Sequence, residues 1–540
     1  MNIGRFILRW LAYLPIRRAW IQACAFLDTH SQTRDVQDRL LKYLISRSEQ
    51  TAFGRDHNFA GINSYEDFTA RVPVRSYGQL QPYVDRVLNG ETTALIPPGD
   101  PIVMFALTSG TTNQPKYIPV TGEFLKHMRR GFNVYGILAL ADHHDAWVRP
   151  ILQITSPMCE FLSPTGVPCG AISGLQAATQ LRTVRWMYPV PPEVASISDH
   201  VAKYYTIMRC GIGRNVAFII TGNPSSPIKL VETAQAHAES MIRDIADGTI
   251  TPPGEVAQEI RRRLRFRPNR KLAAKLEAGL KQDGQLLPRH FWRLSFLANW
   301  TGGTLKLYLK RLRELFGDVP VRDIGLLASE GRFSIPITDN TAAGIAEITS
   351  NFLEFIPAEE RESPDPPVLR AHEVEVGREY FLIATNFNGL WRYDIDDRVR
   401  VVAKYGQSPV FEFMSRGAHT ANITGEKITE HQVVEAMHRT AAKMAIDVNR
   451  FLLQPTFAAT PYYQIQLEGP DSRDIGQVAQ AMDEALIELN MEYKAKRTSG
   501  RLGPIRAVVL QPGTFQQAEL AKIQSDPGRS EQYKHRYLAT

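Results

Sequence analysis

The sequence predicts an α/β protein with at least two lobes, and three observations support this. The chain has 540 residues, whereas single hydrophobic cores stop growing at about 300 residues. In the middle of the chain an apolar, strand-like segment, VAFIIT at 216–221, precedes a helical pattern over 229–248; this alternation is typical of α/β lobes with parallel sheet. A strand-rich stretch from 378 leads into a helix–strand–strand–helix–strand order after 418, which is the size of a small second domain.

The composition is that of an ordinary globular protein. Hydrophobic residues make up 44% of the chain, aromatic residues 9% and charged residues 22%, which excludes disordered, collagen-like and disulfide-scaffold proteins. The net charge of +7 is small for this length, so we expect no nucleic-acid partner. The four cysteines form no C-x-x-C pair, which argues against a zinc ribbon or dithiol site and fits a cytoplasmic protein; they are Cys24, Cys159, Cys169 and Cys210.

Helical patterning dominates residues 1–50. Arg5, Arg9 and Pro15 interrupt the first apolar run, which is too short to cross a bilayer, and no cleavage site follows it. We therefore expect a helix packed on the body of the protein, without stable membrane insertion. A helix lying at a membrane interface is the alternative.

The next segments are shorter. Gly, Asn and Asp cluster over 53–68 and predict turns. Residues 73–91 read as a short helix that stops at Asn89-Gly90, and the apolar run 102–108 is of strand type. Farther along, 255–283 is a charged helical stretch. Its basic cluster predicts a solvated helical face rather than a nucleic-acid patch and consists of Arg261, Arg262, Arg263, Arg265, Arg267, Arg270 and Lys271.

A polar loop after the strand at 102–108 is the most informative segment. Its backbone N–H groups and hydroxyls form a combination that binds anions; the residues are Thr108, Ser109, Gly110, Thr111, Thr112, Asn113, Gln114, Pro115 and Lys116. Gly110 allows close approach of a phosphate, and Lys116 supplies a mobile positive charge. The spacing of a Walker loop is absent. The loop therefore predicts a phosphate site of another type, with a plain surface turn as the alternative.

The full string TSGTTNQPKYIPVT at 108–121 resembles the phosphate-binding motif of the adenylate-forming superfamily. Within it, the chain is most similar to the acyl acid amido synthetases of the auxin-responsive promoter (Gretchen Hagen) family. Further similar segments follow in the family's order and lie at 51–91, 299–308, 325–331, 351–357 and 377–397. The resemblance implies a large N-terminal adenylate-forming domain, a β-barrel plus α/β sheets, with a smaller mobile α+β C-terminal domain.

The resemblance also implies roles for single residues. The loop from Thr108 to Lys116 would hold the phosphates of ATP, and Ser329-Glu330 resembles the family's Ser-Glu motif, in which the carboxylate places Mg²⁺. Leu326 stands where the family usually has a tyrosine near adenine. Asp397 would bind the ribose hydroxyls, and Asp396 replaces the usual glycine before it.

The junction of the two domains is implied near Gly417, which gives a large domain of 1–416 that binds ATP and acyl acid and a small domain of 417–540. Arg416 would contact ribose or phosphate. The motif around Lys534 resembles the family's C-terminal catalytic lysine, with Lys522 as the fallback. Together with Lys116 and Glu330, Lys534 completes the predicted catalytic set.

The implied reaction has two steps. ATP adenylates a carboxylic acid, and the amine of an amino acid then displaces AMP to form an amide. An acyl-CoA ligase and a nucleotide-binding relative without turnover remain alternatives, because the shared motifs do not specify the acceptor. The acid itself is unspecified; Phe124 and Trp300 are candidate pocket walls, although core packing is the commoner role of such side chains. Asp142-His143-His144-Asp145 reads as a solvated loop rather than a metal site.

Overall fold

The structure of the protein is a computed structural model. It describes residues 3–108, 116–180, 184–302, 308–417, 420–421, 423–424, 426, 428–448, 450–458, 460–468, 475–498, 502–525 and 535–539. Two compact units are present; the larger comprises Met1–Trp300, Arg311–Ile395 and Val399–Phe413, and the smaller comprises Thr301–Lys310, Asp396–Arg398 and Met414–Thr540. The assignment of 1–416 and 417–540 to a substrate-binding and a mobile domain stays a prediction.

The chain begins with two long helices, α1 (Ile3–Thr29) and α2 (Thr33–Ser48). Ala23 and Phe26 of α1 are buried in a core that also contains Val134 and Tyr135 of α6 (Gly122–Asp142). Helix α1 therefore packs on the body of the large unit, as expected. Of the helices that the structure describes, none is long and apolar enough to span a membrane.

Three short helices follow, namely α3 (Ala52–Asp56), α4 (Tyr65–Arg71) and α5 (Tyr77–Leu88). The prediction of turns over 53–68 was thus wrong in part, because local capping supports helices there. The Thr51 hydroxyl accepts the N–H of Gly54 at 2.9 Å, and Ser64 and Asp67 form a capping box at the start of α4. Helix α5 ends before Gly90, as the sequence predicts; this glycine has a φ of +105°.

The segment after α5 forms a four-stranded sheet, ordered β2 (Lys116–Thr121), β1 (Ile102–Thr108), β5 (Pro168–Gly170) and β4 (Phe161–Leu162). Strands β1 and β2 are antiparallel neighbours. Thr121 ends β2 and caps α6, since its hydroxyl accepts the N–H of Phe124 at 3.1 Å. The strand that precedes the polar loop is therefore confirmed.

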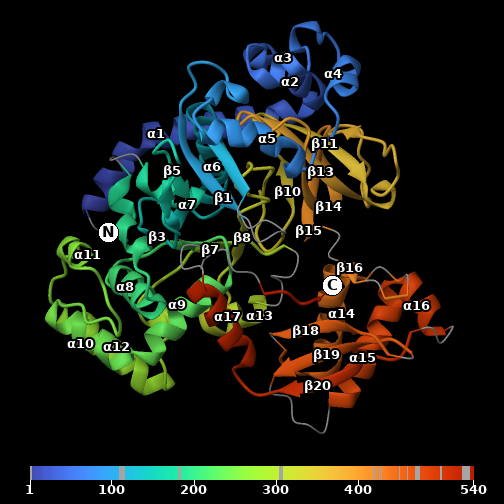
Figure 1. Cartoon of the computed structure of the whole chain (residues 1–540). Coiled ribbons are helices and arrows are strands. Elements are labelled where there is room, and N and C mark those ends of the chain that lie inside the picture. Colours follow the sequence, from blue (N-terminus) through green and yellow to red (C-terminus); the bar gives the residue numbers. More distant parts are fainter. Residues whose placement is uncertain are drawn as a thin grey trace. The chain divides into compact units, whose positions relative to one another are not determined.

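A parallel sheet with the order β3 (Ile151–Gln153), β6 (Phe218–Ile220), β7 (Phe296–Asn299) and β8 (Val321–Asp323) confirms the α/β prediction (Figure 1). The helices between these strands include α7 (Ile172–Ala178), α8 (His200–Ile212), α9 (Ser225–Ala236) and α10 (Ala238–Asp247). The single helix expected over 229–248 is two helices, because His237 leaves the helical backbone with a φ of −119°.

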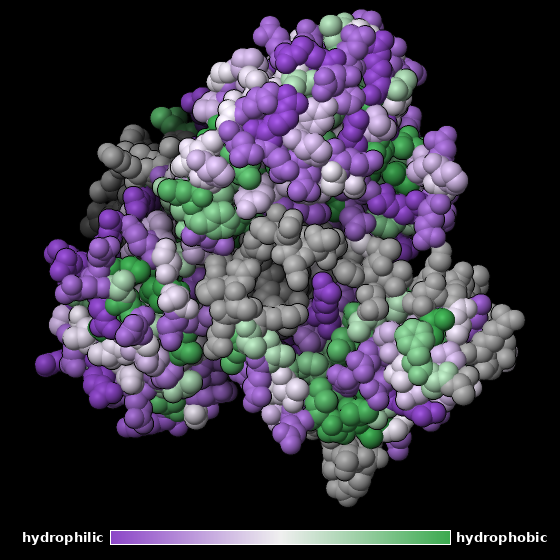
Figure 2. Space-filling model, viewed as in Figure 1, coloured by the Kyte–Doolittle hydropathy of each residue, from purple (hydrophilic) through white to green (hydrophobic). Residues whose placement is uncertain are grey.

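The basic cluster lies on α11 (Gln258–Arg263), on α12 (Arg270–Asp283) and between them. Each of its seven basic residues is exposed. Figure 2 shows the region around α10 to α12 as largely hydrophilic. Arg263 pairs with Glu193. The solvated face is thus confirmed.

A seven-stranded sheet contains the remaining strands of the large unit, in the order β12 (Leu369–Arg370), β11 (Asn351–Pro357), β13 (Glu379–Asn386), β14 (Tyr393–Tyr405), β15 (Ser408–Arg416), β10 (Gly344–Ala346) and β9 (Ser334–Ile335). Every residue of β11 is buried, which explains its continuous apolar pattern. The predicted closure of these strands into a barrel stays a prediction. Helix α13 (Tyr308–Phe316) precedes β8.

The small unit is an α+β domain with its own core. Its sheet has the order β18 (Phe451–Thr456), β19 (Tyr462–Glu468) and β20 (Arg506–Leu510), beside a short pair, β16 (Thr420–Ala421) and β17 (Ile428–Thr429). Its helices are α14 (Glu430–Met444), α15 (Ile475–Leu489), α16 (Met491–Thr498) and α17 (Thr514–Ser525). The predicted helix–strand–strand–helix–strand order is confirmed.

Candidate active site

The polar loop connects two paired strands. Thr108 at the end of β1 lies opposite Lys116 at the start of β2, so the loop is the connection of a β-hairpin. Thr108 is buried, and its hydroxyl has no hydrogen-bond partner among the described residues. Such a group needs an acceptor or donor from elsewhere. The other predicted loop residues lie outside the described part of the chain; they are Ser109, Gly110, Thr111 and Thr112.

Helix α5 holds the start of β2 through Tyr77. The phenol donates to the carbonyl of Tyr117 at 3.2 Å and accepts the N–H of the same residue at 2.8 Å. Burial raises the pKa of Tyr77 to about 12, and the negative charge of Glu330 adds to the effect. The Lys116 ammonium lies 5.4 Å from the centre of the Tyr77 ring. Tyr77 thus holds the start of the strand that carries the predicted phosphate lysine, a role that sequence reasoning missed.

We expect Tyr77→Phe to loosen the hairpin without removing any charge. The N–H and C=O of Tyr117 lose their two hydrogen bonds to the phenol, and each such bond contributes about 0.5–1.5 kcal/mol to stability. Denaturant unfolding should show that loss. Tyr83→Phe is the matched control, since Tyr83 lies on the same helix and its hydroxyl donates a hydrogen bond to the exposed Asp56 carboxylate. Equal stability of the two variants would contradict the role of Tyr77.

Glu330 lies in a tight turn between β8 and β9. Ala328 and Gly331 exchange backbone hydrogen bonds across it, at 2.9 and 3.3 Å. The Glu330 side chain is only 1% exposed, and its backbone carbonyl accepts amide N–H groups from Asn386 and Asn388 at 2.8 and 3.1 Å. Ser329 beside it is half-buried. The fold therefore fixes the predicted Ser-Glu motif rigidly.

A buried carboxylate of this kind suits a hard cation. Within the described part of the chain, no three His, Cys, Asp or Glu side chains gather as a metal site. Mg²⁺ keeps waters and commonly takes one or two carboxylates plus substrate phosphates. The residues present therefore fit a cation that arrives with a phosphate ligand and is held by Glu330.

The remaining predicted residues belong to the small unit or to the end of β15. Asp397 is 5% exposed. Asp396 before it has a φ of +63°, and its carbonyl accepts the N–H of Gly417 at 2.6 Å. This φ lies in the left-handed region, which glycine adopts without steric cost, and this explains why the family motif usually has glycine at this position. Arg416 ends β15; its side chain, that of Lys522 and the whole of Lys534 lie outside what the structure describes.

A buried ion pair at the start of β14 was not predicted. The Arg392 Nε donates to the two carboxylate oxygens of Glu354 at 3.1 and 3.0 Å, and Tyr65 donates to the same carboxylate at 2.7 Å. Glu354 is fully buried and Arg392 is 4% exposed. The Arg392 Nη1 also donates to the carbonyl of Val72 at 2.9 Å. This pair fixes the strand β14 that carries Asp397.

The acidic and histidine run at 142–145 takes part in ion pairs. Asp142 pairs with Arg322, which also pairs with Asp339, and the Asp339 carboxylate contacts His143 at 2.9 Å. Asp145 accepts from Arg149 at 3.1 Å. The interpretation of this run as a solvated loop rather than a metal site stays a prediction.

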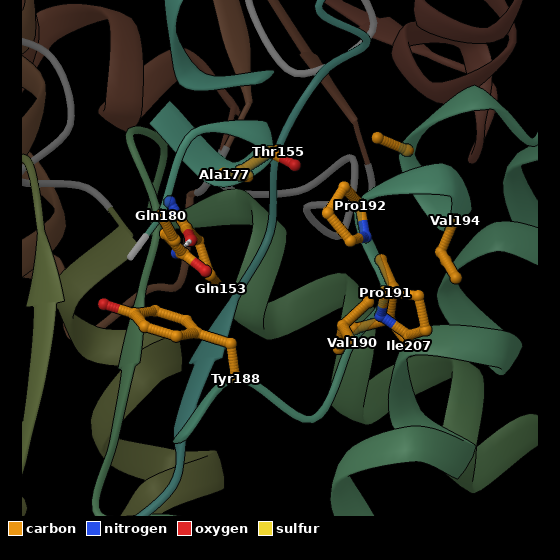
Figure 3. A pocket seen from close by; sticks show the side chains of 11 residues that line it. Gln153, Thr155, Ala177, Gln180, Tyr188, Val190, Pro191, Pro192, Val194 and Ile207 are labelled. Atoms are coloured by element: carbon orange, nitrogen blue, oxygen red, sulfur yellow. Dashed lines mark hydrogen bonds between the residues drawn. The ribbon is translucent and has the colours of Figure 1, made fainter. Parts of the chain in front are cut away.

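One pocket lies at the carboxyl end of β3, the edge at which open α/β sheets commonly bind ligands. In Figure 3 the amides of Gln153 and Gln180 meet on one side, near Tyr188, and are joined by a hydrogen bond of 2.9 Å. The other side is apolar and is lined by Val190, Pro191, Pro192, Val194 and Ile207. The pocket can accept an apolar group with one polar contact. None of its lining residues carries a positive charge.

The candidate pocket walls have different surroundings. Trp300 is half-buried and its ring centre lies 4.8 Å from that of Phe413. Phe124 and Leu326 are core residues. Phe124 also lines a cavity that contains Arg332, which was not predicted.

Comparison with known proteins gives consistent results along the whole chain. Residues 23–321, 345–416 and 431–540 match the N-terminal, central and C-terminal domains of the GH3 family. The jasmonoyl–L-amino acid synthetase GH3.5 of Oryza sativa subsp. japonica is 24% identical over 90% of this chain and 89% of its own length. The indole-3-acetic acid-amido synthetase GH3.3 of Arabidopsis thaliana is 22% identical over 92% and 88%. The solved GH3.15 acyl acid amido synthetase has the same fold, with a TM-score of 0.82, 21% identity and coverage of 95% and 92%.

Proposed function

The chain belongs to the GH3 family, and we propose on that premise that it is an acyl acid amido synthetase. It transfers the adenylyl group of ATP to a carboxylic acid, with release of pyrophosphate. The amine of an amino acid then attacks the acyl carbon, and AMP leaves as an amide forms. The observation that carries this proposal is the start of the hairpin, where the buried Thr108 hydroxyl has no partner among the described residues and Lys116 lies opposite it. The buried carboxylate of Glu330 adds a candidate cation ligand from the family's Ser-Glu motif.

Each group has a task in adenylation. Thr108 and Lys116, with Ser109, Gly110, Thr111 and Thr112, would bind the phosphates of ATP. Lys116 offsets negative charge that builds up as pyrophosphate leaves, and such electrostatic stabilisation is commonly the largest catalytic contribution. Glu330, with Ser329 beside it, would hold Mg²⁺, which supplies Lewis-acid charge neutralisation at the phosphates when bound.

Three residues of the junction and the small domain complete the set that we propose. Asp397 would accept hydrogen bonds from the ribose hydroxyls. Arg416 would contact ribose or phosphate. Lys534 would act in adenylation, and the small domain would then move to admit the amine, as gated domains do. The cytoplasm, which supplies ATP and keeps the four free cysteines reduced, is the compartment that we propose.

The proposal is tested by pyrophosphate exchange. The protein is incubated with ATP, Mg²⁺ and a panel of carboxylic acids that includes jasmonic and indole-3-acetic acid. We expect exchange with at least one acid, its loss on chelation of Mg²⁺, and an amide of the expected mass when amino acids are added. A thioester with coenzyme A and no amide would favour an acyl-CoA ligase. No exchange with any acid would support a nucleotide-binding protein without turnover.

A further inference from the structure

Arg332 is a buried cation with unused hydrogen-bonding capacity. It follows the Ser329-Glu330 motif, and its side chain is 2% exposed. The guanidinium lies over the rings of Phe132 and Tyr135, at 4.2 and 5.3 Å from their centres. Its Nη1 donates to the carbonyl of Ile324 at 2.8 Å. Its Nε and Nη2 have no acceptor among the described residues.

The guanidinium borders a small recess, which is lined by Phe124, His127, Met128, Gly131, Glu347, Ser350, Asn351 and Phe387. Glu347 does not occupy the free donors of Arg332 with a hydrogen bond. Its two carboxylate oxygens accept instead from the backbone N–H groups of Thr349 and Ser350, at 3.2 and 3.0 Å. The Arg332 Nε and Nη2 therefore face the recess as buried donors that need an acceptor.

His127 is a second polar group at this recess. Its ring stacks on Phe387 with 3.9 Å between the ring centres, and its Nδ1 has no partner in the described part of the chain. Burial lowers the pKa of His127 to about 4, so the ring is neutral at physiological pH. Arg332 is thus the group that gives the recess its positive charge.

The free donors of Arg332 have a geometry that selects a ligand class. Nε–H and Nη2–H lie on the same edge of the planar guanidinium, and this edge matches the two oxygens of a carboxylate. The recess has room for about one water-sized group. It therefore has room for one oxygen of a ligand's head group, and the remainder of the ligand would lie outside it.

We propose that Arg332 binds the carboxylate of the acyl acid through Nε and Nη2 and thereby selects monocarboxylic acids. This inference rests on the proposed function. Its place in the chain agrees, because Arg332 is two residues from Glu330 of the Ser-Glu motif. Phe124, Met128 and Phe387 add an apolar surround that strengthens a charged hydrogen bond.

Direct titration tests the inference apart from turnover. Dissociation constants are measured for indole-3-acetate, jasmonate and benzoate, for the primary amide of each, and for ATP. Wild-type protein should bind at least one carboxylate about 10- to 100-fold more tightly than its amide, as two charge-assisted hydrogen bonds predict. Arg332→Met should abolish that preference and leave ATP binding unchanged. Arg332→Lys should restore part of the preference.

A second variant displaces Arg332 without changing its charge. A Cβ at Gly131 would lie 2.8 Å from the Arg332 Cδ, whereas a Cβ at Gly136 of the same helix would meet no atom within 4 Å. Gly131→Ala should therefore weaken binding of the carboxylate several-fold, and the matched control Gly136→Ala should not. Both substitutions favour the helix equally, so the comparison isolates the displacement.

Three results would overturn the inference. In the first, the wild-type protein binds no carboxylate better than its amide. In the second, the Arg332→Met protein keeps the preference for the carboxylate. In the third, Arg332→Met reduces that preference no more than Arg370→Met does. The last residue is a buried arginine that pairs with Asp38. Pyrophosphate exchange with an unchanged preference in Arg332→Met would leave the proposed function intact and assign the recess to an ordinary bound water. If the protein showed no pyrophosphate exchange but its preference for carboxylates depended on Arg332, the inference would stand and the proposed function would be wrong.

Discussion

Lys116→Met should reduce the initial rate of pyrophosphate exchange by about 100- to 1,000-fold, the cost of removing one preorganised electrostatic group from an active site. Methionine keeps much of the apolar stem of lysine, so it can still pack over Tyr77, whose ring centre lies 5.4 Å from the native ammonium. The change therefore removes charge and little else. Exchange is measured at saturating ATP and acid, and thermal unfolding should show an intact fold.

The matched control is Lys126→Met on α6. The side chain of Lys126 is 74% exposed and pairs with Glu123 at 3.2 Å, and such surface pairs contribute about 0–1 kcal/mol. We expect this variant to exchange pyrophosphate like the wild type. If Lys116→Met did the same, the assignment of the hairpin to the phosphates of ATP would be wrong.

Glu354→Ala should destabilise the large unit by about 3–5 kcal/mol, because it leaves the buried Arg392 without its counter-charge. The carboxylate is fully buried and also accepts the Tyr65 hydroxyl at 2.7 Å. Urea unfolding of the large unit gives the measurement. Since Arg392 precedes Asp397 by five residues, pyrophosphate exchange should fall as well.

Two comparisons make this result specific. Glu359→Ala removes an exposed pair with Arg378 and should change the free energy of unfolding by less than about 0.5 kcal/mol. Combining Glu354→Leu with Arg392→Met removes both charges, and it should cost less than Glu354→Ala alone, since no charge is left buried and unpaired. If the Glu354→Ala protein were as stable as Glu359→Ala, the pair of Glu354 and Arg392 would not contribute to the stability of the large unit.

Patterns of neighbouring residues predicted much of the fold. The apolar run at 102–108 forms β1, and 73–91 contains α5 and its stop at Gly90. Helices are harder to delimit where capping is subtle: the break at His237 and the helix α3 were not predicted. The replacement of glycine by Asp396 was visible in the sequence, but its φ of +63° was not. Backbone angles of that kind depend on contacts such as the bond from Gly417.

The candidate site was likewise predicted only in part from the sequence. Motif order predicted Lys116, Glu330 and Asp397 as site residues. The burial of Glu330 and Asp397, the hydrogen bonds of the Tyr77 phenol to Tyr117, and the recess at Arg332 required the structure. These features depend on contacts between residues far apart in the chain, which no spacing rule gives.

The sequence by itself therefore determined the family and the alternation of strands and helices, and it predicted a phosphate loop, because each depends on residues close together in the chain. Only the tertiary structure decided which charges are paired. Glu354 meets Arg392 within hydrogen-bonding distance, whereas Arg332 keeps two free donors among the described residues. The physical reason is that burial and desolvation arise from contacts between distant segments, and these set the energy of a charge.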